Sequence, residues 1–492
     1  MIREWKPTEK PDGIEMRERL KKIKEKWIQL QLRMKEAGLP VVVLVEGWGA
    51  GGKGSVIGSL IQEIDPRFFK VVSMSGPTEE ERRRPFLYRY FVQIPEAGKF
   101  VFFDSGWADE VTKARARKEL SDKKYQDRLE SICRFERQLQ DDGYLVLKFF
   151  FQIFQKEQKK RLEELAKDKA TAWRVSEHDK WQNKHYDKCL EVFADYLEAT
   201  DRPGLTWNIV DAKEKKWAFL QVMEVLCSRL EEALFSNKPV AAQQPARFPM
   251  LETPALSQVS LRKYLGEDDY REELDQLQEK LRTLHYKLYR EKIPVIIVYE
   301  GWDASGKGGN IKRLAGALDP RGYEVHPIAA PEPGEKARHF LWRFWKRIPK
   351  TGHISIFDRS WYGRVMVERI EGLCSENDWK RAYHEINEFE AELKKWGAVI
   401  IKFWVQIDKD TQLARFEERQ RTPEKCWKIT EEDWRNREKW DLYEEAVNEM
   451  LQKTSTETAP WHILESVDKR YARIKALRIV TETLQKVLEK TD

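Results

Sequence analysis

Long apolar runs, paired cysteines and a large excess of one charge are all lacking from this sequence. The longest apolar runs, such as PVVVLV (40–45) and PVIIVY (294–299), are far shorter than the roughly 20 residues of a membrane span. The first residues, MIREWKPTEKPDG, contain no apolar core of the kind that a signal peptide needs. The five cysteines are scattered and form no CxxC pair, which is typical of reduced thiols. We therefore expect a cytoplasmic protein that does not bind a membrane.

The charge balance also limits the choice of partners. The chain carries 89 basic and 83 acidic residues, a net charge of +6, which is too small an excess to indicate nucleic acid as a partner. It still allows local basic tracks for another polyanion. With 492 residues, 41% of them hydrophobic, the chain has enough material for roughly two to four folded domains.

A long internal repeat organises the chain. Gly47 and Gly301 begin two similar loops, and a constant offset of 254 positions (301 − 47) separates them. The same offset relates further identical pairs: Asp65 and Asp319, Asp104 and Asp358, Lys148 and Lys402, and Trp207 and Trp461. One offset that holds without net insertion indicates a duplicated domain rather than a solenoid. We predict an N-terminal domain over 1–236, a linker rich in Pro, Ala and Gln over 237–259, and a C-terminal domain over 260–492. The oligomeric state stays open, with a homo-oligomer among the possibilities.

Each copy has the pattern of an α/β domain. Residues 15–37 and 270–292 are charged but carry apolar residues at helical spacing, which predicts a surface helix packed on its own domain. Short apolar runs then alternate with helical stretches. The predicted strands are 40–45, 99–104, 144–153 and 205–210 in the first copy and 294–299, 353–358, 398–407 and 460–464 in the second. This alternation favours a parallel sheet with helices on both faces, whose ligands bind at the carboxyl ends of the strands.

The stretch GWDASGKGG (301–309) is typical of a phosphate-binding loop. It contains GxxxxGK, formed by Gly301, Gly306 and Lys307, between a predicted strand and a predicted helix. Small residues such as Ser305, Gly306 and Gly308 let successive backbone N–H groups face phosphate oxygens, and the helix adds its positive end. A plain glycine turn is the alternative, but the strand before and the helix after the loop disfavour it.

Two aspartates are the candidate metal ligands. Such a loop usually continues with Ser or Thr, whose hydroxyl binds Mg²⁺, but here Gly308 follows Lys307. Asp303, inside the loop, is placed to replace that hydroxyl, although a solvent-facing acid is the alternative. Asp358 ends the predicted strand 353–358, at the Walker B position. We expect Mg²⁺ on Asp303 and Asp358.

Basic residues follow both motifs. DRSWYGR (358–364) supplies Arg359 and Arg364, which suit the charge that develops when a phosphoryl group moves. The alternative is an Arg–Asp pair that only fixes the strand end. Residues 415–430 carry further cations and are typical of a mobile lid that excludes water, or of a solvated helix face. The candidate lid residues are Arg415, Arg419, Lys425 and Lys428.

These motifs together carry a family resemblance. EGWDASGKGGNIKRL, DRSWYGRVMVERI, KCWKIT and PWHILESVDKRYARI make the chain similar to the polyphosphate kinase 2 family, and the duplication resembles that of its two-domain members. The resemblance implies a thymidylate-kinase-like P-loop fold with a helical lid. It also implies Mg²⁺-dependent phosphoryl transfer from inorganic polyphosphate to AMP, which gives ADP.

The resemblance also implies roles for single residues. Asp303 and Asp358 would bind the metal and orient the acceptor phosphate, and Lys307, Arg359 and Arg364 would act on the moving group. Lys312 and Arg313 match positions that face the polyphosphate.

The N-terminal copy departs from this pattern at the same places. The replacements are Gly49 for Asp303, Ser105 for Arg359, Glu110 for Arg364, Gly58 for Lys312 and Ser59 for Arg313. We therefore expect the chemistry in the C-terminal domain and a degenerate N-terminal copy, either structural or a weak polyphosphate binder through residues 82–84. Two alternatives remain open: an ATP-dependent nucleoside monophosphate kinase and a non-catalytic polyphosphate-binding regulator.

Overall fold

The structure is a computed structural model that describes residues 1–74, 76–235, 245–424, 426 and 429–490. Its contacts divide the chain into two compact units. Unit 1 comprises Met1–Thr78, Leu87–Gln244 and Pro333–His339, and unit 2 comprises Glu79–Phe86, Pro245–Glu332 and Phe340–Asp492. Each half of the sequence therefore forms the body of one unit.

Each unit is built on a five-stranded parallel sheet, as the sequence predicts. The strand order is β2-β3-β1-β4-β5 in unit 1 and β7-β8-β6-β9-β10 in unit 2, so the two copies share one topology. The strands are β1 (Val41–Gly47), β2 (Phe69–Ser73), β3 (Phe100–Asp104), β4 (Leu145–Gln152), β5 (Trp207–Asp211), β6 (Val295–Gly301), β7 (Tyr323–Pro327), β8 (Ile354–Asp358), β9 (Val399–Gln406) and β10 (Trp461–Glu465).

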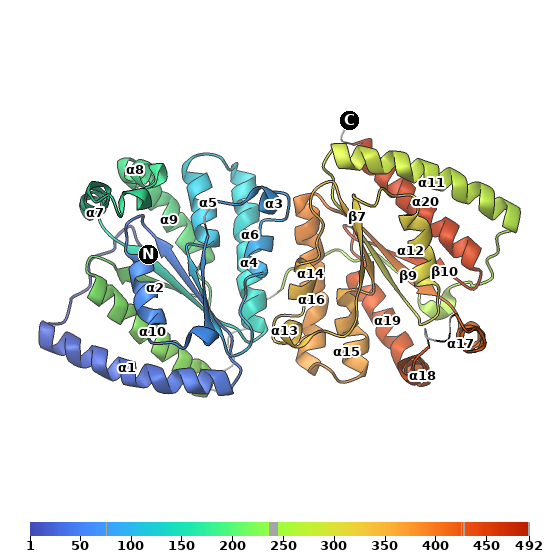
Figure 1. The fold of residues 1–492 in the computed structure, drawn as a ribbon, viewed down its shortest axis with the longest axis horizontal. Coiled ribbons are helices and arrows are strands. Elements are labelled where there is room, and N and C mark those ends of the chain that lie inside the picture. Colours follow the sequence, from blue (N-terminus) through green and yellow to red (C-terminus); the bar gives the residue numbers. More distant parts are fainter. Residues whose placement is uncertain (75, 236–244, 425, 427–428, 491–492) are drawn as a thin grey trace. The chain divides into compact units, whose positions relative to one another are not determined.

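Helices cover both faces of each sheet (Figure 1). The first half contains α1 (Gly13–Glu36), α2 (Lys53–Ile61), α3 (Glu79–Arg82), α4 (Tyr88–Phe91), α5 (Trp107–Ala116), α6 (Asp122–Asp141), α7 (Gln155–Lys167), α8 (Glu177–Lys184), α9 (Tyr186–Thr200) and α10 (Lys215–Phe235). The second half contains α11 (Glu267–Arg290), α12 (Lys307–Ala315), α13 (Pro333–Lys336), α14 (Trp342–Trp345), α15 (Val367–Ile370), α16 (Glu376–Trp396), α17 (Lys409–Arg421), α18 (Glu431–Glu438), α19 (Trp440–Thr454) and α20 (Lys469–Leu488). In unit 2, α11, α12 and α20 lie on one face of the sheet, and α16 and α19 lie on the other.

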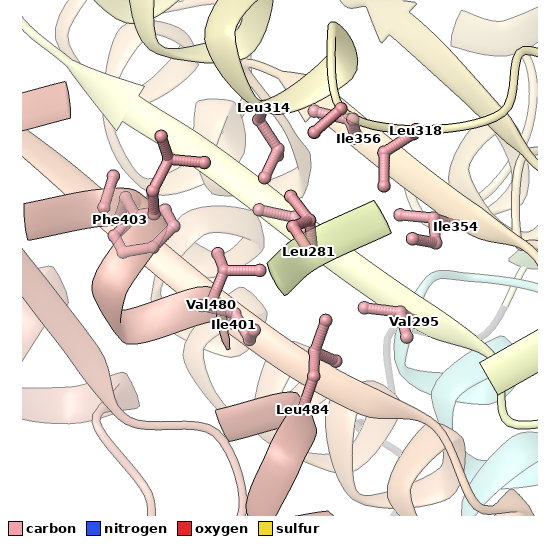
Figure 2. Packing of buried hydrophobic residues seen from close by; sticks show 14 of the residues in the cluster. Leu281, Val295, Leu314, Leu318, Ile354, Ile356, Ile401, Phe403, Val480 and Leu484 are labelled. Atoms are coloured by element: carbon pink, nitrogen blue, oxygen red, sulfur yellow. The ribbon is translucent and has the colours of Figure 1, made fainter. Parts of the chain in front are cut away.

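The cores form where the sequence places its apolar runs. Every residue of β1 is buried, and so are the first six of β6, as expected for central strands covered on both faces. Figure 2 shows Leu281 of α11 and Leu484 of α20 packed over Val295 and Ile401 of the sheet. The helices predicted over 15–37 and 270–292 are α1 and α11, and each packs on its own unit, which confirms that prediction.

The edge strands β2 and β7 are missing from the predicted set. Only Val72 is buried in β2 and only His326 in β7, because each strand has a neighbour on one side alone. Their residues therefore do not form the continuous apolar run that marks the central strands. The four strands predicted in each copy are confirmed, and the edge strand is a fifth that the sequence did not reveal.

The predicted linker, 237–259, lies partly outside the described residues. Its described part contacts unit 2, where the Leu251 N–H donates a hydrogen bond to the Ser455 carbonyl. In the described part of the chain, no helix has both the length and the apolar character that crossing a bilayer requires.

The arginines proposed to bind polyphosphate in the N-terminal copy belong to a segment of unit 2. There the Arg83 guanidinium donates to the Thr351 carbonyl at 2.6 Å, and the Arg84 guanidinium donates to the Ile348 carbonyl. These two groups donate to backbone oxygens of unit 2, so the predicted site does not lie in unit 1, and its binding of polyphosphate stays a prediction.

A buried lysine–glutamate pair joins several elements in each unit. In unit 2, Lys402 Nζ of β9 lies 2.8 Å from Glu390 Oε2 of α16, and neither side chain is exposed. Lys402 also donates to the Tyr362 hydroxyl and to the Thr454 carbonyl, while Trp361 and Tyr362 donate to Glu390. The pair thus fixes the short 3₁₀ helix η4 (Trp361–Val365) against the sheet. In unit 1, Lys148 and Glu136 form the same pair at 2.8 Å.

Removal of one partner of this pair is expected to be strongly destabilising. In Glu390→Ala a buried ammonium loses its counter-charge, and we expect a loss of about 3–5 kcal/mol in the free energy of unfolding. The double variant Glu390→Leu/Lys402→Met leaves no buried charge unpaired, so it should lose less. Urea-induced unfolding measures both. Equal losses in the single and double variants would contradict this role of charge pairing.

Candidate active site

The loop after β6 is bent by two glycines with positive φ. Gly301 has φ +151°, and a Cβ there would lie 2.5 Å from the Val405 carbonyl oxygen, so no side chain fits. Gly306 has φ +114° and precedes the first residue of α12. Lys307 Nζ folds back and donates to the carbonyls of Gly301 (2.6 Å) and Trp302 (3.1 Å). The loop therefore has the curled backbone and the returning lysine of a phosphate-binding loop.

Asp303 lies inside this loop in a positive environment. Arg359 Nη2 donates to its Oδ1 at 2.9 Å, and Asn436 Nδ2 donates to its Oδ2 at 3.0 Å. Burial alone would raise the pKa of Asp303, but the charges of Lys307 and Arg359 and the hydrogen bond from Asn436 outweigh it and hold the pKa below its usual value. Asp303 is therefore ionised at neutral pH.

Asp358 and Arg359 lie at the carboxyl end of β8, next to the loop. The Arg359 N–H donates to the Tyr299 carbonyl of β6, and Arg359 has φ +64°, a conformation that is uncommon outside glycine. Ser105, at the same place in unit 1, has φ +60°. Because both units have this bend, the fold and not the arginine side chain is its cause. It turns the chain sharply after the strand, and the arginine side chain reaches Asp303.

A buried glutamate precedes the loop and was not predicted as a site residue. Glu300 Oε1 accepts a hydrogen bond from Ser360 Oγ at 2.7 Å, so the loop and the segment after β8 are tied together. Burial raises the pKa of Glu300 to about 7, although the Ser360 hydrogen bond and the charge of Lys307 oppose the rise. Glu300 therefore titrates near neutral pH.

Two cavities meet at Asp303 and Arg359. The first, of about 410 Å³, lies over the loop and α12. Its lining includes Asp303, Ser305, Gly306, Lys307, Gly308, Asp358, Arg359, Arg419 and Asp433. The second, of about 80 Å³, lies on the other side of Asp303 and has more apolar walls. Its lining includes Glu300, Gly301, Trp302, Met366, Val367, Trp404, Gln412, Asn436 and Tyr443. The arrangement therefore has a larger polar space over the loop beside a smaller and more apolar one.

Most of the predicted residues surround these cavities, but some do not. Arg364 is not among the described residues that line either one; it pairs with Glu368 at 3.1 Å and lies over the Phe340 ring. Lys312 and Arg313 lie on α12 and are also absent from both linings, as far as the described residues go.

The predicted lid residues have different surroundings. Arg419 lines the larger cavity, whereas Lys425 and Lys428 lie outside the described residues. Arg415 is buried in α17, and its guanidinium donates to the carbonyls of Ala304 (3.0 Å) and Ser305 (2.9 Å). Arg415 thus supports the loop from behind.

The residues present fit a magnesium ion in the larger cavity. Asp303 and Asp358 both line it, and the Asp358 carboxylate accepts no hydrogen bond from the residues that the structure describes. No cluster of three or more His, Cys, Asp or Glu side chains suited to a metal occurs among the described residues. Mg²⁺ commonly takes one or two carboxylates and fills its other positions with water and phosphate oxygens, so two aspartates suffice.

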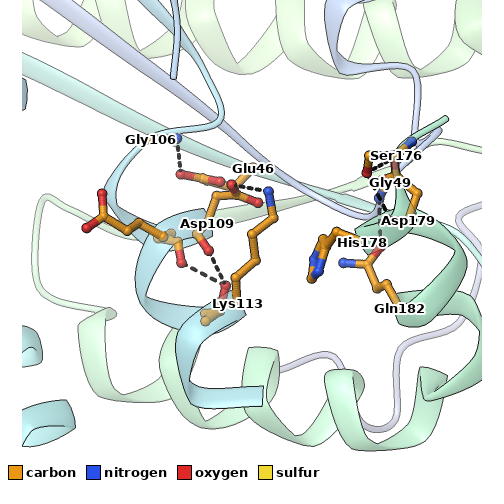
Figure 3. A network of polar contacts seen from close by, with 12 residues as sticks. Glu46, Gly49, Gly106, Asp109, Lys113, Ser176, His178, Asp179 and Gln182 are labelled. Carbon is orange, nitrogen blue, oxygen red and sulfur yellow. Dashed lines mark hydrogen bonds and ion pairs between the residues drawn. The ribbon is translucent and has the colours of Figure 1, made fainter. Parts of the chain in front are cut away.

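The corresponding part of unit 1 is occupied by its own side chains (Figure 3). Lys53 still donates to the carbonyls of Gly47 and Trp48. At the place of the smaller cavity, however, an Asp109–Lys113 ion pair of 2.6 Å stands where unit 2 has Gly363 and Val367. The loop fold is retained, but the space beside it is filled.

Sequence reasoning missed Glu300, Ser360 and Asn436. Glu300 recurs as Glu46 at the offset of 254, which was a usable signal. Asn436 lies in the charged stretch EEDWRNRE, where nothing in the spacing separates a site residue from a solvated one.

Comparisons with known proteins find relatives that match the chain over nearly its full length. The family model described as Polyphosphate kinase 2 (PPK2) matches residues 11–238 and again residues 264–492. The chain is similar to the polyphosphate:AMP phosphotransferase of Pseudomonas aeruginosa, with 40% identity over 99% of this chain and 97% of that protein. It is also similar to the polyphosphate:AMP phosphotransferase of Acinetobacter johnsonii, with 36% identity over 90% and 91%. A crystal structure of a Pseudomonas aeruginosa PA01 protein described as a polyphosphate kinase 2 has a TM-score of 0.85, 37% identity, and coverage of 99% of this chain and 98% of that one.

The raised pKa of Glu300 predicts a pH-dependent stability. The folded state favours the protonated carboxyl, so this stabilisation is complete below the ordinary pKa of 4.5 and is lost as the pH rises through about 7. Glu300→Gln imitates the neutral form. Between pH 5 and pH 8 the wild type should therefore lose about 2 kcal/mol more unfolding free energy than the variant. Urea unfolding at several pH values measures this, and parallel curves for the two proteins would contradict it.

Proposed function

The chain belongs to the polyphosphate kinase 2 family, and from that membership we propose that unit 2 transfers the terminal phosphoryl group of inorganic polyphosphate to AMP, giving ADP. The similarity to full-length polyphosphate:AMP phosphotransferases supports both substrates. The reducing conditions that suit five unpaired cysteines support a cytoplasmic location.

One observation supports unit 2 as the catalytic unit. Asp303, Lys307 and Arg359 converge there on one loop, with Arg359 and Asp303 2.9 Å apart. Unit 1 keeps Lys53 but has Gly49 and Ser105 at the other two places. Neither of these two residues supplies a carboxylate for a metal or a cation to offset the charge of a moving phosphoryl group.

The larger cavity would hold the end of the polyphosphate. Asp303, Ser305, Gly306, Lys307 and Gly308 line this space. The backbone N–H groups of this stretch and the Lys307 ammonium would bind the terminal phosphates. Arg359 and Arg419 line it and would offset negative charge as the phosphoryl group moves. Lys312, exposed on α12, is the candidate for contact with phosphates further along the chain.

The nucleoside of AMP would approach Asp303 from the side of the smaller cavity, and its phosphate would lie beside Asp303 and Asp358. An oxygen of that phosphate attacks the terminal phosphorus, and the bond to the bridging oxygen breaks, so the electron pair leaves with the shortened polyphosphate. The attacking oxygen is already anionic and needs no general base, so alignment and charge compensation supply most of the rate. Bound Mg²⁺, held by Asp303 and Asp358, would draw the two anionic substrates together by screening their charges.

Matched substitutions in the two loops test the assignment. Asp303→Ala and Lys307→Ala should each lower kcat/KM for AMP with polyphosphate by about 10²-fold or more, because each removes a group that faces the transferring phosphoryl. Lys53→Ala, the counterpart of Lys307→Ala in unit 1, should leave the rate unchanged. The assay is ADP formation from AMP, with circular dichroism to verify folding.

The phosphoryl donor that supports ADP formation distinguishes the proposed function from the two alternatives. AMP is supplied with polyphosphate or with ATP, and a nucleoside monophosphate kinase would form ADP only with ATP. A non-catalytic regulator would bind polyphosphate without forming ADP. Full activity in Asp303→Ala, or an inactive but folded Lys53→Ala, would contradict the assignment to unit 2.

A further inference from the structure

One short helix of each unit, α18 in unit 2 and α8 in unit 1, contacts the loop through one amide side chain, and we refer to these two helices as the lid helices. In unit 2, Asn436 of α18 donates from Nδ2 to Asp303 Oδ2, and its Oδ1 accepts from the Tyr443 hydroxyl at 3.3 Å. The tyrosine donor fixes the orientation of the amide, so that its NH₂ group faces the carboxylate. Arg359 holds the other carboxylate oxygen. The carboxylate of Asp303 is thus anchored from both sides, once by the body of the unit and once by α18.

Helix α18 has few other contacts that hold it closed. None of its described residues is buried. Besides Asn436, the helix contacts the rest of unit 2 through Arg437, which donates to the Lys409 carbonyl and to Gln412, through an ion pair of Arg435 with Glu371, and through the Trp434 ring, which packs on Phe416. Lys439, just after the helix, also pairs with Glu371. Elements held mainly by exposed polar contacts open at low free energy. A single hydrogen bond to a carboxylate is therefore a substantial share of what keeps α18 on the loop.

Unit 1 carries the same contact in a different chemical form. Gln182 of α8 corresponds to Asn436 (436 − 254 = 182), and Gly49 corresponds to Asp303. Gln182 Oε1 accepts from the Gly49 N–H at 2.9 Å (Figure 3). It also accepts from Gln158 Nε2 at 2.8 Å. Asp179 fills the space beside the glycine, where an added Cβ would lie 2.0 Å from its Oδ1.

The two units therefore differ in both partners of this contact, the group on the loop and the amide side chain on the helix. Where the loop has a carboxylate, the lid offers an amide donor on a short side chain. Where the loop offers only a backbone N–H, the lid presents an amide acceptor on a chain one methylene longer, which spans the gap. Both lids close on their loops, but only in unit 2 does the contact pass through the carboxylate of the site.

We propose that Asn436 is a positioning residue that couples closure of α18 to the orientation of the Asp303 carboxylate. Each carboxylate oxygen accepts more than one hydrogen bond, so the bond from Asn436 leaves room for a ligand and fixes the plane of the group. An open α18 removes one of the two anchors, and Asp303 then turns more freely. This inference rests on the proposed function of unit 2 for its consequence in catalysis, but the contact itself can be tested without it.

Hydrogen exchange of the full chain, without metal or substrate, measures the contact. Asn436→Ala should raise exchange over 431–440 by about tenfold, because a charge-assisted hydrogen bond is lost. Asp303→Gly should have the same effect, and the double variant Asp303→Gly/Asn436→Ala should exchange no faster than either single variant. Unchanged exchange in Asn436→Ala, or a further rise in the double variant, would overturn the proposal.

A second double variant transplants the unit 1 contact into unit 2. Asp303→Gly/Asn436→Gln recreates the pairing of Gly49 with Gln182, and Gln412 stands where unit 1 has Gln158. We expect the double variant to exchange more slowly over 431–440 than Asp303→Gly alone, at a rate closer to that of the wild type. Phosphoryl transfer should stay lost in both variants. No recovery of protection would overturn the proposal.

Kinetics separate positioning from a purely structural role. In Asn436→Ala, kcat should fall about tenfold while KM for polyphosphate changes by less than about twofold, because the carboxylate is misaligned but the phosphate loop is intact. Gln182→Ala is the matched control, with faster exchange over 177–186 and unchanged kcat. A rise in KM for polyphosphate with unchanged kcat would contradict positioning. Absence of AMP phosphorylation in the wild type would count against the proposed function alone, since the exchange results stand without it.

Discussion

The buried pair of Lys402 and Glu390 is the interaction on which the geometry of the site depends. It joins β9 to α16 and, through Tyr362 and Trp361, holds the segment that follows Asp358 and Arg359. Two charges without solvent tolerate little displacement, because any lost contact leaves a charge uncompensated. The pair therefore fixes the position of the segment after β8, and with it the positions of Asp358 and Arg359 just before that segment.

Comparison of the two units distinguishes the residues that the fold requires from those that the chemistry requires. Unit 1 retains the buried pair, the glycine that contacts the neighbouring strand, the loop lysine and the bend with positive φ after β3. It lacks the loop carboxylate and the arginine next to it. The shared features are those that shape the backbone, whereas the differing features are side chains that reach the cavities. A P-loop fold is therefore not by itself a sign of activity.

The site of unit 2 is assembled from groups that restrain one another. Asp303 accepts from Arg359 and Asn436, Glu300 accepts from Ser360, and Arg415 holds the loop carbonyls from behind. Most of the energy of phosphoryl transfer catalysis comes from such alignment, since the groups face the substrates before the reaction begins. The hydrogen bond from Asn436 adds α18 to this network.

The sequence by itself determined the duplication, the central strands and the phosphate-binding loop of this protein. Offsets between identical residues revealed two copies, apolar runs marked the central strands, and GxxxxGK with its replacements marked the loop and the copy that carries the acids. Those features are local patterns or identities at a fixed offset, so the sequence alone shows them. The edge strands were missed because they are exposed, and Arg364 and Arg415 could not be placed because a guanidinium beside a loop binds phosphate or carbonyl oxygens equally well. Only the tertiary structure decided these cases, and only it brought Asn436, 133 residues away, onto Asp303, because packing and not spacing selects the partner of a polar side chain.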